Sequence, residues 1–305
     1  MQRLVIATRE SPLALWQAEF VKAALESAHP GLEVALLGMR TAGDRWLSSP
    51  LSEVGGKGLF IKELEQALLE GRADLAVHSM KDVPAHLAAE FALPVIAFRD
   101  DVRDALVSSS GATLAELPQG ARIGSASLRR QSQLLARRPD LQVAPVRGNV
   151  GTRLGKLEAG EFDALVLASA GLLRLGLQGR ITEHLNVVDS VPAAGQGALG
   201  IECLAGAADV RSLIEVLNDE RVSRCVRAER AVSAGLGADC SAPLGAHAVL
   251  AGERIELAAV LGSVDGRRML RARAVGGDPA DVGAEVVESL KAQGAMSILD
   301  QLRHP

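Results

Sequence analysis

The stretch 74–84 joins a short apolar segment to side chains that could do chemistry. Residues 75–77 are apolar and predict a buried strand, and Ser79, Lys81 and Asp82 follow directly after it. In α/β proteins, ligands and reactive groups gather at the carboxyl ends of such strands. The alternative is an exposed loop in which Lys81 and Asp82 contact each other locally. Asp82 is the candidate catalytic residue because other parts of the chain supply partners for a carboxylate at this position.

A second group of side chains is basic and lies in the middle of the chain. Of the 33 basic residues in the sequence only six are Lys, and the planar fork of Arg binds carboxylates bidentately. Arg129 and Arg130 follow Ser127 in the first turn of a predicted helix, where cations are electrostatically misplaced unless an anion is bound. Arg147 and Arg153 repeat the arrangement at the next strand–helix junction. The cluster predicts a site for several carboxylates or phosphates.

Two further positions near the amino terminus could bind anions. Ser11 precedes Pro12 at the start of a predicted helix, and the free amides there form an anion site together with the nearby Arg9. Lys57 lies in a glycine-rich loop, residues 48–58, which is either a mobile flap or a plain connection.

The three cysteines differ in their surroundings. They form neither a disulfide framework nor a metal-binding spacing. Cys203 and Cys225 lie on predicted elements and are interpreted as core residues, whereas Cys240 lies in a glycine-rich loop. A loop thiol is a candidate nucleophile or attachment point, so a Cys240–His247 thiol hydrolase is one hypothesis.

Composition restricts the classes of partner. A net charge of −4 and an aromatic content of 2% argue against binding nucleic acid. No apolar run approaches the roughly 18 to 20 residues that span a bilayer, and the first residues lack a signal-peptide pattern. We therefore expect a cytoplasmic protein that has no membrane partner and no metal. A monomer is also expected, although composition does not determine the oligomeric state.

The elements that position these residues alternate between strand and helix. Strands over 4–8 and 33–39 flank a helix over 12–25, which makes a β-α-β unit with a right-handed crossover. Periodicity predicts that one face of this helix lies in the core, and this face comprises Leu13, Trp16, Phe20 and Ala24.

The chain then repeats its own pattern. The segment 71–79 is echoed by 160–169, since in both a Gly ends a helix and an Asp opens an apolar strand. Two similar α/β lobes with a cleft between them follow from this repeat. A charged segment, 98–104, is expected to leave the first lobe, and a Gly/Pro segment, 191–197, to return to it. The predicted domains are a first lobe of residues 1–98 with 198–218, an arginine-rich second lobe of residues 103–192, and a small α+β C-terminal domain of residues 220–305.

Several of these segments match known motifs over nearly the whole length of the chain. The matching stretches are Ile-Ala-Thr-Arg-Glu-Ser-Pro-Leu-Ala (6–14), Val-Gly-Gly-Lys-Gly-Leu-Phe (54–60), His-Ser-Met-Lys-Asp-Val-Pro (78–84), Ser-Leu-Arg-Arg (127–130), Arg-Gly-Asn-Val-Gly-Thr-Arg-Leu (147–154) and Gly-Gln-Gly-Ala (195–198), with Cys240 in its loop. The chain resembles the porphobilinogen deaminases, also called hydroxymethylbilane synthases.

The resemblance implies two lobes similar to periplasmic binding proteins and a dipyrromethane cofactor joined to Cys240 by a thioether. It implies that four porphobilinogen molecules lose ammonia and are linked head to tail before a linear tetrapyrrole is released. It also implies site residues by position. Those for the cofactor are Cys240, Lys81, Asp82, Ser125, Ser127, Arg129, Arg130 and Arg153. Those for the substrate are Arg9, Ser11, Lys57, Phe60, Arg147, Arg174 and Gln196. The alternative from another class is a two-lobed binding module for a polycarboxylate ligand.

Overall fold

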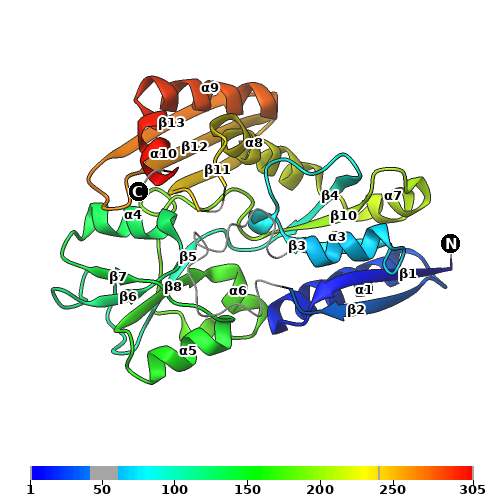
Figure 1. Cartoon of the computed structure of the whole chain (residues 1–305), viewed down its shortest axis with the longest axis horizontal. Helices are drawn as coiled ribbons and strands as arrows, with labels where there is room; N and C mark the ends of the chain where they lie inside the picture. The colour runs from blue at the N-terminus through cyan, green and yellow to red at the C-terminus, as the bar shows by residue number, and fades with distance from the viewer. Residues whose placement is uncertain (1, 42–60, 240, 304–305) are drawn as a thin grey trace. The chain divides into compact units, whose positions relative to one another are not determined.

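The structure is a computed structural model, and it describes residues 2–41, 61–239 and 241–303 (Figure 1). The chain divides into two compact units. Unit 1 comprises residues 1–100 and 198–223, and unit 2 comprises residues 101–197 and 224–305. Within the described ranges, no helix is both long enough and apolar enough to cross a membrane.

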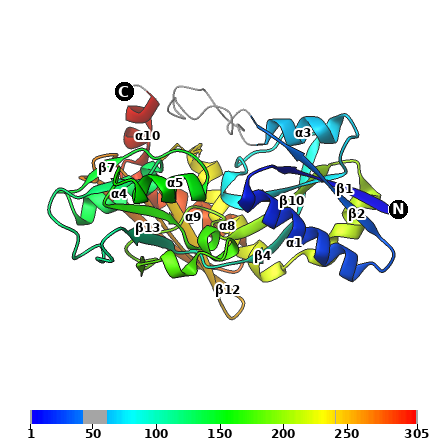
Figure 2. The same cartoon turned by 90° about the horizontal axis from the view of Figure 1, so that it is seen from below.

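Unit 1 is built on a five-stranded mixed sheet in the order β2-β1-β3-β10-β4. Its strands are β1 (Arg3–Arg9), β2 (Glu33–Met39), β3 (Leu75–Ser79), β4 (Phe91–Arg99) and β10 (Ala198–Leu204). Its helices are α1 (Pro12–Ala28), α3 (Lys62–Leu69) and α7 (Ala208–Ile214), with 3-10 turns η1 (Met80–Asp82) and η3 (Glu215–Leu217). The first three strands are parallel, whereas β10 runs antiparallel to both β3 and β4. Helices α1 and α3 cover opposite faces of this sheet (Figure 2).

Helix α1 begins where the sequence predicts, but a different face of it is buried. The hydroxyl of Ser11 accepts a hydrogen bond from the backbone N–H of Ala14, so Ser11 is the N-cap. The buried residues are Gln17, Ala18, Val21 and Leu25. The prediction that Phe20 lies in the core is wrong, because Phe20 is 37% exposed and stacks on Trp16 with ring centroids 5.5 Å apart. Two apolar stripes with the same helical period run along α1, and periodicity alone does not say which one faces the sheet.

Unit 2 contains a second five-stranded sheet in the order β7-β6-β8-β5-β9. Its strands are β5 (Asp104–Ser108), β6 (Arg122–Gly124), β7 (Gln142–Ala144), β8 (Ala164–Ala168) and β9 (Glu183–His184). The helices of this part are α4 (Leu128–Arg137), α5 (Val150–Glu158) and α6 (Ser169–Arg174), with the 3-10 turn η2 (Gln178–Arg180).

The two five-stranded sheets share one topology. In each, three parallel strands are followed by an antiparallel fourth strand, β10 in unit 1 and β5 in unit 2. The chain reaches each fourth strand only after it has passed through the other unit. Strand β5 of unit 2 follows residues 1–100 of unit 1, and β10 of unit 1 follows residues 101–197 of unit 2. The predicted α/β class with two similar lobes is confirmed by the two sheets of the same topology. The cleft between the lobes stays a prediction.

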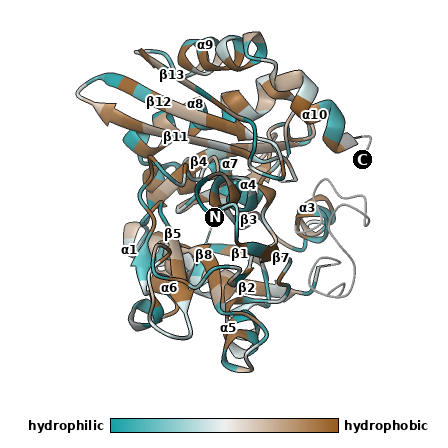
Figure 3. Cartoon of the chain, turned by 90° about the vertical axis from the view of Figure 1, so that its left-hand side faces the viewer, coloured by the Kyte–Doolittle hydropathy of each residue, from teal (hydrophilic) through white to brown (hydrophobic). Residues whose placement is uncertain are grey.

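The rest of unit 2 is a small α+β domain, as predicted. Its antiparallel strands are β11 (Leu244–Ala251), β12 (Arg254–Gly262) and β13 (Met269–Gly276). Its helices are α9 (Pro279–Ala292), α10 (Ala295–Arg303) and residues 224–236 of α8 (Glu220–Leu236), whose first turn belongs to unit 1. Hydrophilic and hydrophobic residues alternate over residues 254–257 at the start of β12, as expected where one face of a sheet is covered, and the rest of the strand is apolar (Figure 3). Cys225 packs in this core and Cys203 in the core of unit 1, which confirms both as core residues. The predicted domain boundaries stay predictions.

Candidate functional site

A pocket in unit 1 collects polar side chains at the carboxyl ends of β1 and β3. It is lined by Arg9, Ala14, Gln17, Ile61, Leu64, Val77, His78, Ser79 and Asp82. The pocket therefore brings together Arg9 and Asp82, which the sequence places 73 positions apart. Ser11 and Lys81 are not among its lining residues, although Ser11 caps the helix that begins beside Arg9.

The turn η1 holds Asp82 at the edge of this pocket. Met80 is buried, and a Cβ at Gly200 on the neighbouring strand β10 would collide with its sulfur. The turn ends at Val83, whose N–H donates to Met80 O at 3.2 Å. Asp82 itself is exposed and Lys81 is half-buried. Met80 therefore anchors the turn in the sheet and leaves the carboxylate of Asp82 at the surface.

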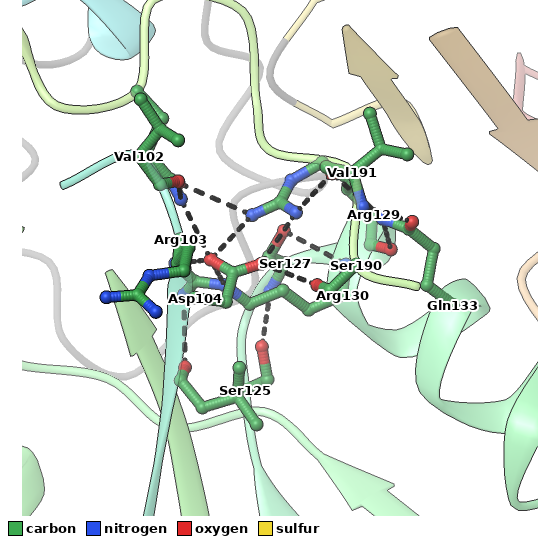
Figure 4. Close-up of polar contacts among 12 residues, drawn as sticks. Val102, Arg103, Asp104, Ser125, Ser127, Arg129, Arg130, Gln133, Ser190 and Val191 are labelled. Atoms are coloured by element: carbon green, nitrogen blue, oxygen red, sulfur yellow. Dashed lines mark hydrogen bonds and ion pairs between the residues drawn. The ribbon is translucent and has the colours of Figure 1, made fainter. Parts of the chain in front are cut away.

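In unit 2, Ser127 is the N-cap of α4 as predicted, and two arginines of the first turn are buried. The Ser127 hydroxyl accepts from the N–H of Arg130, and the Ser125 hydroxyl accepts from the N–H of Ser127. Arg129 and Arg130 are 4% and 7% exposed. They lie on either side of the carboxylate of Asp104, which is fully buried (Figure 4).

The Asp104 carboxylate makes bonds to four side chains. Arg129 Nη1 donates to Oδ2 at 2.7 Å, and Arg130 Nη2 lies 2.8 Å from Oδ1. Ser190 Oγ donates to Oδ2 at 2.9 Å and Gln196 Nε2 donates to Oδ1 at 3.0 Å. Burial alone would raise the pKa of Asp104, but the charges of Arg129 and Arg130 hold that pKa well below the usual carboxyl range.

This cluster corrects the interpretation of residues 98–104. The sequence placed Asp104 in a charged crossover, but it is the first residue of the buried strand β5. The arginines of the first turn of α4 do face an anion, and that anion is a carboxylate of the chain itself. Gln196, predicted to bind substrate, lies in the same network and also donates to Val102 O at 2.7 Å. Whether Arg129, Arg130 and Gln196 also bind a ligand stays a prediction.

The next strand–helix junction carries Arg147 and Arg153, both half-buried. Asn149 caps α5 by accepting from Thr152 N at 2.9 Å, and Arg153 Nε donates to Gly148 O at 2.8 Å. Gly148 has a φ of 104°, and a Cβ there would come within 2.7 Å of the Thr152 side chain. The tight turn therefore needs glycine and places both arginines at the start of α5.

Arg174 ends α6, is buried, and donates from Nη2 to the backbone O of Gly197. Three predicted site residues, Lys57, Phe60 and Cys240, lie outside the described residues. For the thiol-hydrolase hypothesis, the structure shows only that His247 Nδ1 lies 3.4 Å from Oε1 of the buried Glu229.

Sequence reasoning missed several polar residues near these sites. They are Gln17, His78, Asp104, Ser190 and Glu202. Gln17 Nε2 donates to Ser79 Oγ at 2.8 Å. The sequence pattern that could have revealed Gln17 is a polar residue on the apolar face of α1. For Asp104, the signal was the apolar run that follows it, which has the same form as the runs after Asp74 and Asp163.

Two family models cover most of the chain. The model described as porphobilinogen deaminase, dipyromethane cofactor binding domain, matches residues 4–212, and the C-terminal domain of the same family matches residues 223–292. Porphobilinogen deaminase of Thiobacillus denitrificans is 54% identical over 304 residues, which is 99% of both chains. That of Burkholderia thailandensis is 53% identical and covers 98% of this chain and 92% of its own.

A more distant likeness is to the VFT2 domain of Bordetella pertussis BvgS, at 17% identity and a TM-score of 0.44, over 70% of this chain and 85% of that one. This likeness supports no functional conclusion. The relatives at 53–54% identity are named as enzymes, so the binding-module alternative is not favoured. From the family matches and the full-length relatives, the chain belongs to the porphobilinogen deaminase family.

Proposed function

We propose that the chain deaminates porphobilinogen and links four molecules head to tail on a dipyrromethane primer, and then releases hydroxymethylbilane and ammonia. The observation that carries the proposal is the pocket of unit 1, which gathers Asp82, Arg9 and Ser79 at the ends of β1 and β3. A carboxylate and a guanidinium in one pocket suit a substrate that has both pyrrole N–H donors and carboxylate groups.

The donor set of the chain fits the cofactor. A dipyrromethane presents acetate and propionate groups and pyrrole N–H groups, which require cations and a carboxylate respectively. We assign the carboxylate groups to Lys81, Arg129, Arg130 and Arg153, with Ser125 and Ser127 as neutral donors. Asp82 would accept the N–H groups, and Cys240 would carry the thioether. When bound, the cofactor supplies the pyrrole carbon on which the chain of rings grows.

Asp82 is the proposed catalytic residue. Loss of ammonia from porphobilinogen leaves a cation, and a carboxylate near the pyrrole nitrogen stabilises that cation. The turn that carries Asp82 is anchored by Met80 against Gly200, and Asp82 is exposed, so its carboxylate is placed to accept bonds from a ligand. Arg9 in the same pocket would orient an acetate or propionate of the substrate.

The remaining substrate contacts are assigned by chemistry and position. Arg147, at the start of α5, and Arg174, at the end of α6, would bind further carboxylates, with Ser11 and Gln196 as neutral donors. Lys57 and Phe60 belong to the predicted flap. We also propose that the protein is cytoplasmic and monomeric.

The experiment is intact-mass measurement of the purified chain followed by a turnover assay with porphobilinogen. We expect a mass excess equal to two linked pyrrole units, ammonia release, and a linear tetrapyrrole product. The Cys240→Ser variant should show no mass excess. A parent chain that binds porphobilinogen but releases no ammonia would instead support a binding module.

A further inference from the structure

A buried histidine–glutamate pair lies beneath the pocket of unit 1. His78 is on β3 and Glu202 is on the adjacent antiparallel strand β10, and they are 5% and 0% exposed (Figure 1). Glu202 pairs in register with Ala76, two residues before His78, so both side chains lie on the same face of the sheet. Their Nε2 and Oε2 atoms are 2.7 Å apart, which is the distance of a strong hydrogen bond.

The burial of both groups favours forms of the pair that compensate the charge of Glu202. The second oxygen of Glu202, Oε1, is buried and makes no hydrogen bond to any described residue. A buried carboxylate is costly unless a partner compensates its charge. That compensation is complete when the imidazole is doubly protonated, or when the proton lies on Glu202 itself. In both of these forms His78 Nδ1 carries a hydrogen that it can donate.

His78 connects this pair to the pocket. It lines the pocket with Arg9 and Asp82, whereas Glu202 does not. Nδ1 is the ring nitrogen that Glu202 does not engage. From α3, Glu65 also responds to the pair: burial raises the pKa of Glu65, the charge of Glu202 raises it further, and His78 lowers it. The charged groups around His78 are therefore Glu202, Glu65, Arg9 and Asp82.

We propose that His78, oriented by Glu202, is a second proton-transfer residue of this pocket alongside Asp82. The inference rests on the proposed function. The aminomethyl group of porphobilinogen reacts in its protonated form: the carbon–nitrogen bond breaks, its electron pair goes to the nitrogen, and ammonia and a substrate cation result. His78 Nδ1 then gives its proton to the ammonia, which becomes ammonium, and the pair is left with one negative charge.

The same pair then accepts the proton that the coupling step produces. Coupling forms a carbon–carbon bond and breaks the carbon–hydrogen bond of the attacking pyrrole carbon, whose electrons stay in the ring. His78 Nδ1 would accept the released proton, which restores the pair. The pair is thus negative during the interval in which the substrate is a cation, and this adds to the stabilisation from Asp82.

The test compares His78→Gln with a matched control, His29→Gln. Glutamine keeps a donor toward Glu202 but cannot carry a proton between two sites. His29 lies in unit 1, is half-buried, bonds to Leu213 O and does not line the pocket. With cofactor loading verified by mass, single-turnover coupling in His78→Gln should fall about 100- to 10,000-fold, while His29→Gln stays near the parent.

Two readouts separate proton transfer from a structural role. From the second addition onward, the ring added last attacks from its free α-carbon and loses the hydrogen there. Porphobilinogen deuterated at this carbon should therefore show a larger isotope effect on the second and later additions in His78→Gln than in the parent, because removal of that proton becomes slow. Imidazole nitrogen NMR of the parent sequence and of unloaded Cys240→Ser should show a hydrogen on Nδ1 at neutral pH, and Glu202→Gln should give a singly protonated ring.

Each outcome decides one statement. Near-parent coupling in loaded His78→Gln overturns the inference, as does an Nδ1 without hydrogen in the parent, a measurement that needs no variant to fold. If the parent releases no ammonia from porphobilinogen, the proposed function itself fails.

Discussion

Replacing Asp104 by Asn tests how much stability a fully buried carboxylate contributes between two arginines. The substitution keeps the size of the side chain, but its amide nitrogen would face a guanidinium donor. Arg129 and Arg130, both less than a tenth exposed, would lose the charge that lies 2.7 and 2.8 Å away. Removing one partner of a buried ion pair costs about 3–5 kcal/mol. We expect the free energy of unfolding of Asp104→Asn to fall by about this amount at neutral pH.

The sign of the pH dependence follows from the lowered pKa of Asp104. Its contribution is complete above the pKa of an unfolded Asp, about 3.9. Below that value the unfolded chain binds a proton that the folded chain does not. The contribution is therefore lost at about 1.4 kcal/mol per pH unit, toward the folded pKa. The stability difference between parent and Asp104→Asn should accordingly narrow on acidification and stay constant toward neutral pH.

The assay is equilibrium urea unfolding with two controls. Asp140→Asn removes a partner at the same distance, 2.7 Å from Arg138, but from a pair whose side chains are 21% and 25% exposed. Its loss should be clearly smaller, because solvent screens the pair. Ser190→Ala removes one neutral hydrogen bond to Asp104 and should cost about 1 kcal/mol. A loss for Asp104→Asn no larger than that for Asp140→Asn would refute the view that burial sets the energy of this cluster.

Three other predictions concern the site and its surroundings. Asp82→Asn should bind porphobilinogen but turn it over about a thousandfold more slowly in single-turnover assays, since a charge pair at about 4 Å contributes about 4 kcal/mol. Asp82→Glu should be intermediate, and a few-fold effect of Asp82→Asn would exclude the cation-stabilising role. Cys240→Ser should lack the covalent mass excess, whereas Cys203→Ala should keep it and lose on the order of 1 kcal/mol of packing energy. A mass excess retained by Cys240→Ser would exclude Cys240 as the attachment point. Glu65→Gln should raise the melting temperature at neutral pH, because the raised pKa of Glu65 means that its ionisation destabilises the fold. This gain in melting temperature should vanish at a pH below the usual carboxyl range. An equal gain at neutral and at acidic pH would contradict the raised pKa of Glu65.

The sequence correctly predicted those features of the site that depend on interactions between residues a few positions apart. The N-caps Ser11 and Ser127 bond to amides three positions away, and the structure has both. The turn after β3 follows from Pro84, which disfavours a helical conformation in the residue before it. These features depend on local backbone geometry, so a single sequence contains the information that determines them.

Sequence reasoning missed Asp104 and Glu202, which lie on the antiparallel fourth strand of each sheet. Strand β5 places Asp104 opposite Ala168, and β10 places Glu202 opposite Ala76, so each strand inserts a buried carboxylate into its sheet. The partner of Glu202, His78, is 124 positions away in the chain. A local pattern cannot reveal such a pairing, because it depends on which strand lies beside which and in what register.

This placement also explains why both acids are compatible with apolar strands. A carboxylate on a buried strand is destabilising by itself and becomes tolerable only when the neighbouring element supplies a cation or a proton. For Asp104 that element is α4, which supplies two fixed cations, so the cluster keeps one charge state over the accessible pH range. For Glu202 it is β3, which supplies the imidazole of His78 at 2.7 Å. The antiparallel fourth strand of each sheet therefore places a buried carboxylate with a different role. In unit 2 this carboxylate holds Arg129 and Arg130 in place, and in unit 1 it keeps a proton available beside Asp82.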